Sequence, residues 1–230
     1  MKKPTIVITG CSRGIGKEVL ELLKSKRAYT IVGISRNWDG DDSRYADISI
    51  HTCDLSNPEA TVKTAREILA ATGGVDILVN NAGTSVFKPV EEIELSDWHR
   101  VLNVNLTAPF ILTSVFIEGM KARNFGRIIN ISSDAEKISF SGASAYCASK
   151  AGLKLFSDCV RKETDGHNIH ITTIAPGRVD TYFNHKTPGQ RPLSLNANDV
   201  AQQVMYVIEQ PEKVEIEAIY LNSSLEKSLH

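Results

Sequence analysis

Short apolar, β-branched runs alternate with longer stretches of helical periodicity along the whole chain. The apolar runs are mostly continuous rather than interrupted by polar residues, which is typical of strands that are covered on both faces. They predict strands at Thr5–Thr9, Thr30–Ile34, Ile48–Cys53, Asp76–Asn80, Arg127–Ser132, Ile169–Ile174 and Glu215–Leu221. The helical stretches lie near residues 14–26, 58–72, 96–121, 144–165 and 197–209. The alternation predicts one α/β domain over residues 1–230, with a doubly wound, mainly parallel seven-stranded sheet flanked by helices.

One segment breaks this alternation. Residues 177–197 contain Gly177, Pro188, Gly189 and Pro192 and show no convincing periodicity. A long irregular segment inside a compact α/β domain is more often functional than accidental. We therefore predict a substrate lid over residues 177–197.

The charge balance and the cysteines narrow the class of protein. Lys and Arg number 26 against 27 Asp and Glu, and the resulting formal charge of −1 argues against a broad basic face for nucleic acid. No apolar stretch approaches the roughly 20 residues that cross a bilayer, so no membrane partner is expected. The four cysteines have neither C-x-x-C spacing nor clustered histidines. No metal site and no disulfide framework is therefore expected, and the cytoplasm is the simplest location.

A glycine-rich turn, which reads T-G-C-S-R-G-I-G over Thr9–Gly16, separates the first strand from the first helix. Glycines allow a tight turn and let backbone N–H groups approach a pyrophosphate at a helix N-terminus. The predicted cofactor contacts in this turn are Gly10, Ser12, Arg13, Gly14, Ile15 and Gly16. By itself the turn is equally consistent with a βα connection that binds nothing. It also contains the pattern G-x-S-x-G, and the alternative reading makes Ser12 the nucleophile of a serine hydrolase.

The end of the second strand predicts the type of dinucleotide. Where an acidic residue would bind the ribose 2′-hydroxyl of NAD(H), the chain reads Gly33-Ile-Ser-Arg-Asn37. A guanidinium pairs well with phosphate oxygens, so Ser35 and Arg36, together with Arg13 in the glycine turn, favour the 2′-phosphate of NADP(H). Taken singly, either arginine is explained equally well as a solvated surface residue.

A tyrosine, a lysine and a serine form a candidate catalytic group. Tyr146 and Lys150 share one face at the start of a predicted helix, although Y-x-x-x-K pairs are also common on amphipathic helices. A nearby cation lowers the pKa of a tyrosine toward neutrality, which a general acid at cytosolic pH needs. Ser132 and Ser133 end the preceding strand, at the sheet edge where α/β proteins bind ligands. Asn105 lies in the long apolar helix before that strand, where a purely structural buried amide is the alternative.

Together these residues resemble the short-chain dehydrogenase/reductase family, in order and over nearly the whole chain. Thr9–Gly16 resembles the family's TGxxxGxG turn, Asn80–Gly83 is identical to its NNAG motif, and Tyr146–Lys150 matches its YxxxK motif. Asp54 resembles the acid that contacts adenine, and Pro176-Gly177 followed by Thr181 resembles the segment beside the nicotinamide. The resemblance implies a Rossmann-like fold and an NADP(H)-dependent oxidoreductase of the carbonyl or ketoacyl reductase type.

The resemblance also implies residue roles. Tyr146 would exchange a proton with the substrate oxygen, and Lys150 would lower the pKa of Tyr146 and hold the nicotinamide ribose. Ser133 would orient the substrate carbonyl, and Asn105 would position a water behind Lys150. The other implied cofactor contacts are Asp54, Leu55, Asn81, Ala82, Gly83, Ile131, Tyr146, Lys150, Pro176, Gly177, Val179 and Thr181. Relatives pair through their two long helices, so a homodimer or homotetramer is implied.

The substrate stays open in the sequence beyond a small-molecule carbonyl or alcohol. Phe140, Tyr182 and Phe183 are candidates for an apolar pocket, and ordinary loop packing explains them equally well. A basic lid would suit an anionic substrate or an acyl-carrier partner, whereas two nearby acids oppose this. The basic residues are Arg178, His185, Lys186 and Arg191, and the acids are Asp134 and Glu136. A dinucleotide-binding regulator without turnover is the remaining alternative.

Overall fold

The centre of the molecule is a seven-stranded sheet in the order β3-β2-β1-β4-β5-β6-β9. The computed structural model describes residues 3–38 and 43–225, so both ends of the predicted 1–230 domain lie outside it. The strands are β1 (Thr5–Thr9), β2 (Thr30–Ser35), β3 (Ser49–Thr52), β4 (Ile77–Asn80), β5 (Gly126–Ile131), β6 (Ile169–Pro176) and β9 (Ala218–Leu221). All six neighbouring pairs are parallel. This confirms the predicted Rossmann-like, doubly wound fold.

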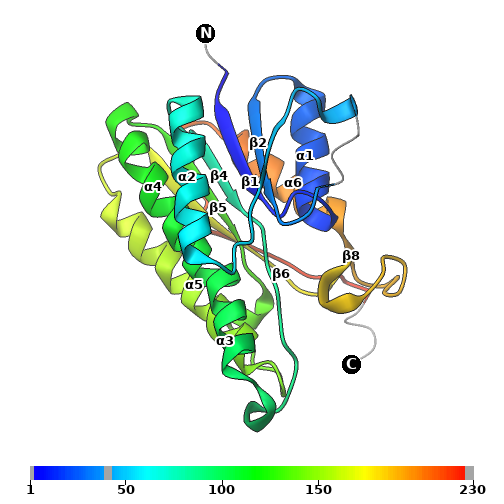
Figure 1. Ribbon diagram of the computed structural model, residues 1–230. Coiled ribbons are helices and arrows are strands. Elements are labelled where there is room, and N and C mark those ends of the chain that lie inside the picture. Colours follow the sequence, from blue (N-terminus) through cyan, green and yellow to red (C-terminus); the bar gives the residue numbers. More distant parts are fainter. Residues whose placement is uncertain (1–2, 39–42, 226–230) are drawn as a thin grey trace.

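Helices cover both faces of the sheet (Figure 1). The helices are α1 (Gly14–Lys26), α2 (Pro58–Thr72), α3 (Leu95–Leu102), α4 (Ala108–Arg123), α5 (Ser144–Glu163) and α6 (Ala197–Ile208). Helices α1 and α6 pack together on one face, and α2, α4 and α5 lie on the other. Helix α3 packs against α5 beyond the sheet.

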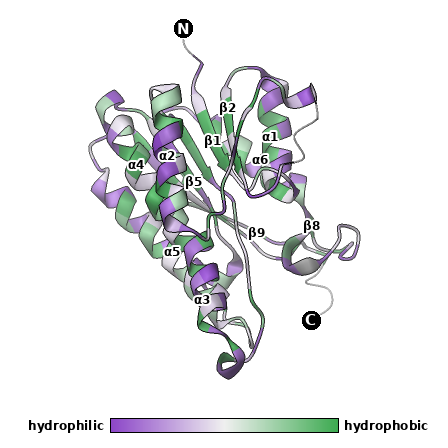
Figure 2. Ribbon diagram, in the orientation of Figure 1, coloured by the Kyte–Doolittle hydropathy of each residue, from purple (hydrophilic) through white to green (hydrophobic). Residues whose placement is uncertain are grey.

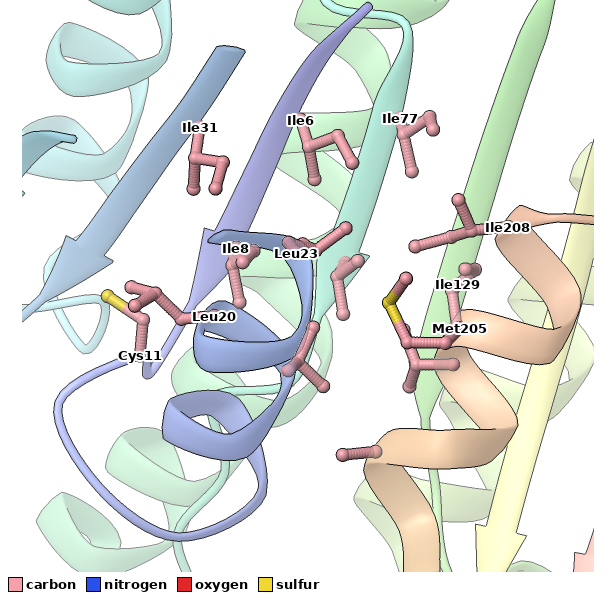
Figure 3. Close-up of a cluster of buried hydrophobic side chains, with 14 of the residues drawn as sticks. Ile6, Ile8, Cys11, Leu20, Leu23, Ile31, Ile77, Ile129, Met205 and Ile208 are labelled. Carbon is pink, nitrogen blue, oxygen red and sulfur yellow. The ribbon is translucent and has the colours of Figure 1, made fainter. Parts of the chain in front are cut away.

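The inner strands are mostly apolar because they lie between two cores. Ile6 and Ile8 of β1 are fully buried on the side of α1 and α6, where they lie in one cluster with Met205 (Figure 3). Val7, between them in sequence, is fully buried in the cluster that contains Phe116 on the opposite face. Successive side chains of a strand point to opposite faces, so a strand between two helix layers has no polar face. Figure 2 shows the same distribution, with hydrophobic residues along the inner strands.

The predicted helix 96–121 is three elements, with a π-helical turn, η3 (Asn103–Thr107), between α3 and α4. The whole run Leu95–Arg123 has an apolar window of mean hydropathy 1.5 and is long enough to cross a membrane. The expectation that no apolar stretch approaches this length is therefore wrong. The structure buries 44% of this window, and α4 packs on α2, as in the core helix of a layered α/β domain.

The irregular segment 177–197 has more structure than its sequence pattern suggested. Two short parallel strands, β7 (Val179–Asp180) and β8 (Leu195–Asn196), pair with each other near its two ends. Asn196 then caps α6, because its side chain accepts a hydrogen bond from Asp199 N while the Asp199 carboxylate accepts one from Asn196 N. The intervening residues are thus a loop whose two ends are held together.

Candidate functional site

A cleft of about 1500 Å³ opens at the carboxyl ends of the central strands. Its walls come from the turns that follow β1, β2, β4, β5 and β6, at the point where the strand order reverses between β1 and β4. This is the position at which doubly wound sheets bind ligands. Of the cofactor and catalytic residues that the sequence predicted, all line the cleft except Gly16 and Asn105.

The glycine turn after β1 is packed against the turn after β4. The Asn81 side chain donates hydrogen bonds to Thr9 O at 2.8 Å and Gly10 O at 3.2 Å. Gly10 has φ +68°, which favours glycine, and a Cβ on Gly16 would lie 2.4 Å from both Gly10 O and Asn81 Nδ2. The backbone conformation therefore favours glycine at position 10, and close packing requires it at position 16. Gly16 supports the turn without lining the cleft.

We expect Gly16→Ala to lower the free energy of unfolding by about 1–3 kcal/mol, because the new methyl overlaps a backbone carbonyl that cannot turn away. Urea denaturation measures this change. Gly119→Ala is the matched control, since its Cβ meets only the flexible end of Arg123 in α4 and alanine favours a helix. Equal stability of the two variants would show that the turn relaxes.

Helix α1 begins in this turn without a side-chain cap. Arg13 occupies the N-cap position, and its side chain makes no capping hydrogen bond. Ser12, Gly14 and Ile15 line the cleft around the same helix end. Uncapped N–H groups and the helix dipole favour an anion at this position. The Arg13 guanidinium lies 5.6 Å from the centre of the Tyr182 ring, so the segment after β6 reaches over the turn.

The end of β2 forms the other end of the cleft. Ser35 is buried, whereas Arg36 is exposed and lines the cleft together with Asp54 and Leu55. The hydrogen bond from Ser56 N holds the pKa of the Asp54 carboxyl below its usual value, and the positive charge of Arg36 adds a smaller effect. Arg36 and Asp54 thus lie close enough to interact at this end of the cleft.

An aromatic wall beside Arg36 was missed by the sequence analysis. Trp38 and Tyr45 meet edge to face, with ring centres 5.2 Å apart. Lys17 Nζ lies 4.1 Å from the centre of the Tyr45 ring. All three side chains line the cleft. They come from α1 and from the chain between β2 and β3, so no local pattern in the sequence joins them.

Tyr146 stands at the start of α5 with its ring between two phenylalanines. The ring centres of Phe87 and Phe183 lie 6.1 and 5.6 Å from that of Tyr146. Burial raises the pKa of Tyr146 to about 12; a hydrogen bond with the Ser133 hydroxyl opposes the shift, and the charge of Asp134 increases it. The sequence analysis expected a pKa lowered toward neutrality. The direction is the reverse, because the desolvation of the phenol outweighs its favourable contacts.

Lys150 lies one helical turn after Tyr146 and is 3% exposed. Its Nζ donates a hydrogen bond to Ile131 O at 2.8 Å and lies 5.8 Å from the centre of the Tyr146 ring. Burial lowers the pKa of Lys150 to about 8, because the interior disfavours the ammonium. The carbonyl at the end of β5 therefore positions a lysine whose pKa is about 8.

Ser133 rather than Ser132 faces the phenol. Ser133 has the hydrogen bond with Tyr146, and its hydroxyl also lies 2.8 Å from Asp134 Oδ1, to which it donates. Ala135 N donates to the same hydroxyl at 3.2 Å. Ser132 Oγ is buried and has no hydrogen-bond partner in the described structure. This geometry agrees with the role that the family resemblance implies for Ser133.

Asn105 lies behind the cleft, in the π-helical turn η3. Its Oδ1 accepts a hydrogen bond from Thr84 N at 2.8 Å, and its Nδ2 donates to Thr84 O and to Ser149 Oγ. A Cβ on Gly83 would lie 3.7 Å from Asn105 Oδ1 and 3.8 Å from Lys150 Nζ. Glycine at position 83 therefore leaves open the space between the amide and the lysine.

A second buried amide group was also missed. Asn80 Nδ2 donates to Asn130 Oδ1, and Asn130 Nδ2 donates to Ser157 Oγ, both at 2.8 Å. The chain of hydrogen bonds joins β4, β5 and α5 beneath the cleft. Asn80 is the first residue of the N-N-A-G pattern, which was the only signal of this group in the sequence.

The segment after β6 closes the cleft on its last side. Pro176, Gly177, Val179 and Thr181 line the cleft, and Gly177 N donates to Leu221 O at 2.9 Å. The basic side chains of Arg178, Lys186 and Arg191 line it as well, whereas the side chain of His185 lies outside the described structure. Thr181 approaches the glycine turn, since a Cβ on Gly14 would lie 3.6 Å from its Cβ.

The described cleft offers no histidine as a base for the alternative in which Ser12 is the nucleophile of a serine hydrolase. Ser12 lines the cleft, but no histidine is found among the described side chains of that lining. A serine nucleophile needs a base within hydrogen-bond reach. The described part of the site thus favours a ligand-binding role for the glycine turn.

Comparison with known proteins assigns the family. The model of the family described as short chain dehydrogenase matches residues 4–191. This chain belongs to that family. The 3-oxoacyl-acyl-carrier-protein reductase FabG of Vibrio cholerae is 32% identical over 179 residues, which cover 76% of this chain and 73% of the relative. A probable NADP-dependent dehydrogenase of Haemophilus influenzae is 28% identical over 239 residues, with 95% of this chain and 93% of the relative covered.

A solved structure extends the similarity to the fold of nearly the whole chain. A metagenomic short-chain oxidoreductase in complex with NADP superposes with a TM-score of 0.83 at 30% sequence identity. The match covers 95% of this chain and 96% of the solved one. The short-chain dehydrogenase fold therefore includes the elements that form the cleft.

Proposed function

We propose that this short-chain dehydrogenase is an NADP(H)-dependent oxidoreductase that interconverts a carbonyl and a secondary alcohol. One observation carries the proposal. The phenol of Tyr146, the Ser133 hydroxyl that contacts it and the Lys150 ammonium lie in the same cleft as the glycine turn. The similarity to an NADP-dependent dehydrogenase and to an oxidoreductase in complex with NADP supports the same activity.

The residues of the cleft fit a dinucleotide. Glycine at positions 10 and 16 lets the turn pack against Asn81 and Ala82, and the uncapped end of α1 offers N–H donors for the oxygens of a pyrophosphate. Arg36 and Arg13 would hold the 2′-phosphate, and Asp54 with Leu55 would hold the adenine. The remaining contacts would come from Ser12, Gly14, Ile15, Ser35, Asn81, Ala82, Gly83, Ile131, Tyr146, Lys150, Pro176, Gly177, Val179 and Thr181. When bound, the nicotinamide supplies or accepts the hydride.

The proton is handled by the chain itself. During reduction Tyr146 donates the phenolic proton to the substrate oxygen, for which a raised pKa keeps the phenol protonated. The Ser133 hydroxyl turns from Asp134 Oδ1 to donate a hydrogen bond to the same oxygen. Lys150 stabilises the phenolate that remains and donates to the ribose hydroxyls. Asn105, behind Lys150, positions a water that returns a proton from solvent.

The preference for NADP(H) is tested at Arg36. We expect Arg36→Ala to weaken NADPH binding about 10- to 100-fold, because a charge-assisted hydrogen bond to phosphate contributes about 1.5–3 kcal/mol. NADH has no 2′-phosphate, so its affinity should change little. Titrations followed by nicotinamide fluorescence measure both constants, and Arg66→Ala on the outer face of α2 is the matched control. An unchanged NADPH:NADH ratio would refute the assignment of the 2′-phosphate to Arg36.

Turnover separates this proposal from a regulator that binds the nucleotide without chemistry. The filled positions 105, 133, 146 and 150 favour turnover.

For the assembly we propose a homodimer through α4 and α5, and a cytoplasmic location. Phe110 on α4 is 52% exposed and Leu155 on α5 is 66% exposed, so these helices present apolar groups outward. The four cysteines are free, as in a reducing compartment.

A further inference from the structure

Large apolar side chains gather where the cleft opens beside Tyr146. Phe87, Ile138 and Phe140 line the cleft, and each of them is between 44% and 54% exposed. Phe183, from the same lining, packs on the Tyr146 ring. Exposed apolar groups that gather in one place mark a binding surface, whereas single ones do not. The surface is continuous with the phenol that we assign to proton transfer.

These side chains come from three segments that are linked by a backbone hydrogen bond and by ring contacts with Tyr146. Lys88 N donates a hydrogen bond to Gly142 O at 2.9 Å, which joins the segment of Phe87 to the segment of Ile138 and Phe140. The rings of Phe87 and Phe183 contact the ring of Tyr146 from two segments. The apolar wall therefore borders the Tyr146 ring, and a backbone hydrogen bond joins two of its segments, as in a preformed pocket for a small molecule.

A negative charge, Asp134, lies beside the hydroxyl that would contact the substrate oxygen. Asp134 Oδ1 lies 2.8 Å from the Ser133 hydroxyl, and the charge of Asp134 acts on Tyr146. A carboxylate near the substrate carbonyl would be repelled by this group. The basic side chains of Arg178, Lys186 and Arg191 also line the cleft, and they come from the segment after β6. An anionic substrate would favour these residues, whereas a neutral one would favour the apolar wall.

We infer that the substrate is a neutral ketone, or the corresponding secondary alcohol, that carries a bulky apolar substituent. The inference rests on the proposed function and names its substrate class. In the reduction, a hydride from NADPH adds to the carbonyl carbon, the proton of Tyr146 adds to the oxygen, and the products are the alcohol and NADP⁺. The apolar substituent lies against Phe87, Phe140 and Ile138.

The test compares two methyl ketones that differ only in the group at the end of the same short chain. Benzylacetone carries a phenyl ring there, and levulinate carries a carboxylate. With saturating NADPH, we expect kcat/KM for benzylacetone to exceed that for levulinate at least tenfold, because the phenyl ring is buried against the apolar wall whereas the carboxylate is not. Equal or faster reduction of levulinate overturns the inference and leaves the oxidoreductase proposal standing. If neither ketone oxidises NADPH, both fail.

A variant in the wall locates the effect. Phe140→Ala should raise the KM for benzylacetone about tenfold with little change in kcat and no change in the KM for levulinate. Phe140 is 45% exposed, so the fold does not depend on it. Tyr206→Ala, at an aromatic residue of α6 that is 53% exposed and away from the cleft, is the control. An unchanged KM in Phe140→Ala overturns the inference.

Discussion

Tyr146→Phe is expected to lower kcat for ketone reduction by about 10²- to 10⁴-fold, the contribution of one positioned general acid. The ring keeps its contacts with Phe87 and Phe183, so the fold and the affinity for NADPH should be unchanged. Steady-state kinetics at saturating NADPH measure kcat, and a fluorescence titration measures binding. Tyr146 is the phenol that has a hydrogen bond with Ser133, so the substitution removes the proposed proton donor itself.

Tyr206→Phe is the matched control, because it removes a hydroxyl from an exposed tyrosine on α6. It should reduce ketones at the wild-type rate. A Tyr146→Phe protein that retained most of its activity would remove Tyr146 from the mechanism. A Tyr146→Phe protein that lost NADPH binding as well would show that the hydroxyl positions the nucleotide rather than the proton.

Lys150→Met is expected to remove a pH-dependent change of about 3 kcal/mol in the free energy of unfolding. The pKa of Lys150 falls from 10.5 to about 8 on folding, and each pKa unit corresponds to about 1.36 kcal/mol. Between these two values the unfolded chain holds a proton that the folded protein lacks, so stability rises with pH. Below pH 8 the cost of burying the ammonium is present in full. The rise should be missing from the variant.

Urea denaturation at intervals from pH 7 to pH 10.5 measures this difference between the two proteins. Tyr146 acts in the opposite direction, since its raised pKa makes stability fall as the pH rises from 10 to about 12. It does so in both proteins and cancels in the comparison. Lys63→Met, at a side chain of α2 that is 78% exposed, should follow the wild type. Parallel curves for Lys150→Met and wild type would mean that Lys150 keeps an ordinary pKa.

Helix α2 and the strands of the sheet could be predicted from sequence because local signals determine them. Helix α2 begins and ends as predicted, since the Asn57 side chain accepts a hydrogen bond from Ala60 N and Gly73 adopts φ +71° at the C-cap. The strands predicted from the mostly apolar runs match all seven strands of the sheet. The last strand was predicted too long, because only Ala218–Leu221 pairs with β6.

The features that the sequence analysis missed depend on contacts between distant segments. The π-helical turn at Asn105 has no local signature, and its amide is held by Thr84 and Ser149. The pair β7 and β8 spans only two residues in each strand, which is too short for a pattern. The direction of the pKa shift of Tyr146 was wrong for a related reason. Spacing showed that a cation was near, but it did not show how completely the phenol is desolvated.

The buried amides beneath the cleft have a consequence for how the active site tolerates change. Asn80 and Asn130 face each other in the register of β4 and β5, and Asn130 reaches Ser157 about three helical turns beyond Tyr146 on α5. A helix is stiff, so this remote contact sets the rotation of α5 about its own axis and hence the direction in which the phenol points. We therefore expect the turnover rate to be sensitive to substitutions in the interior that never touch a ligand.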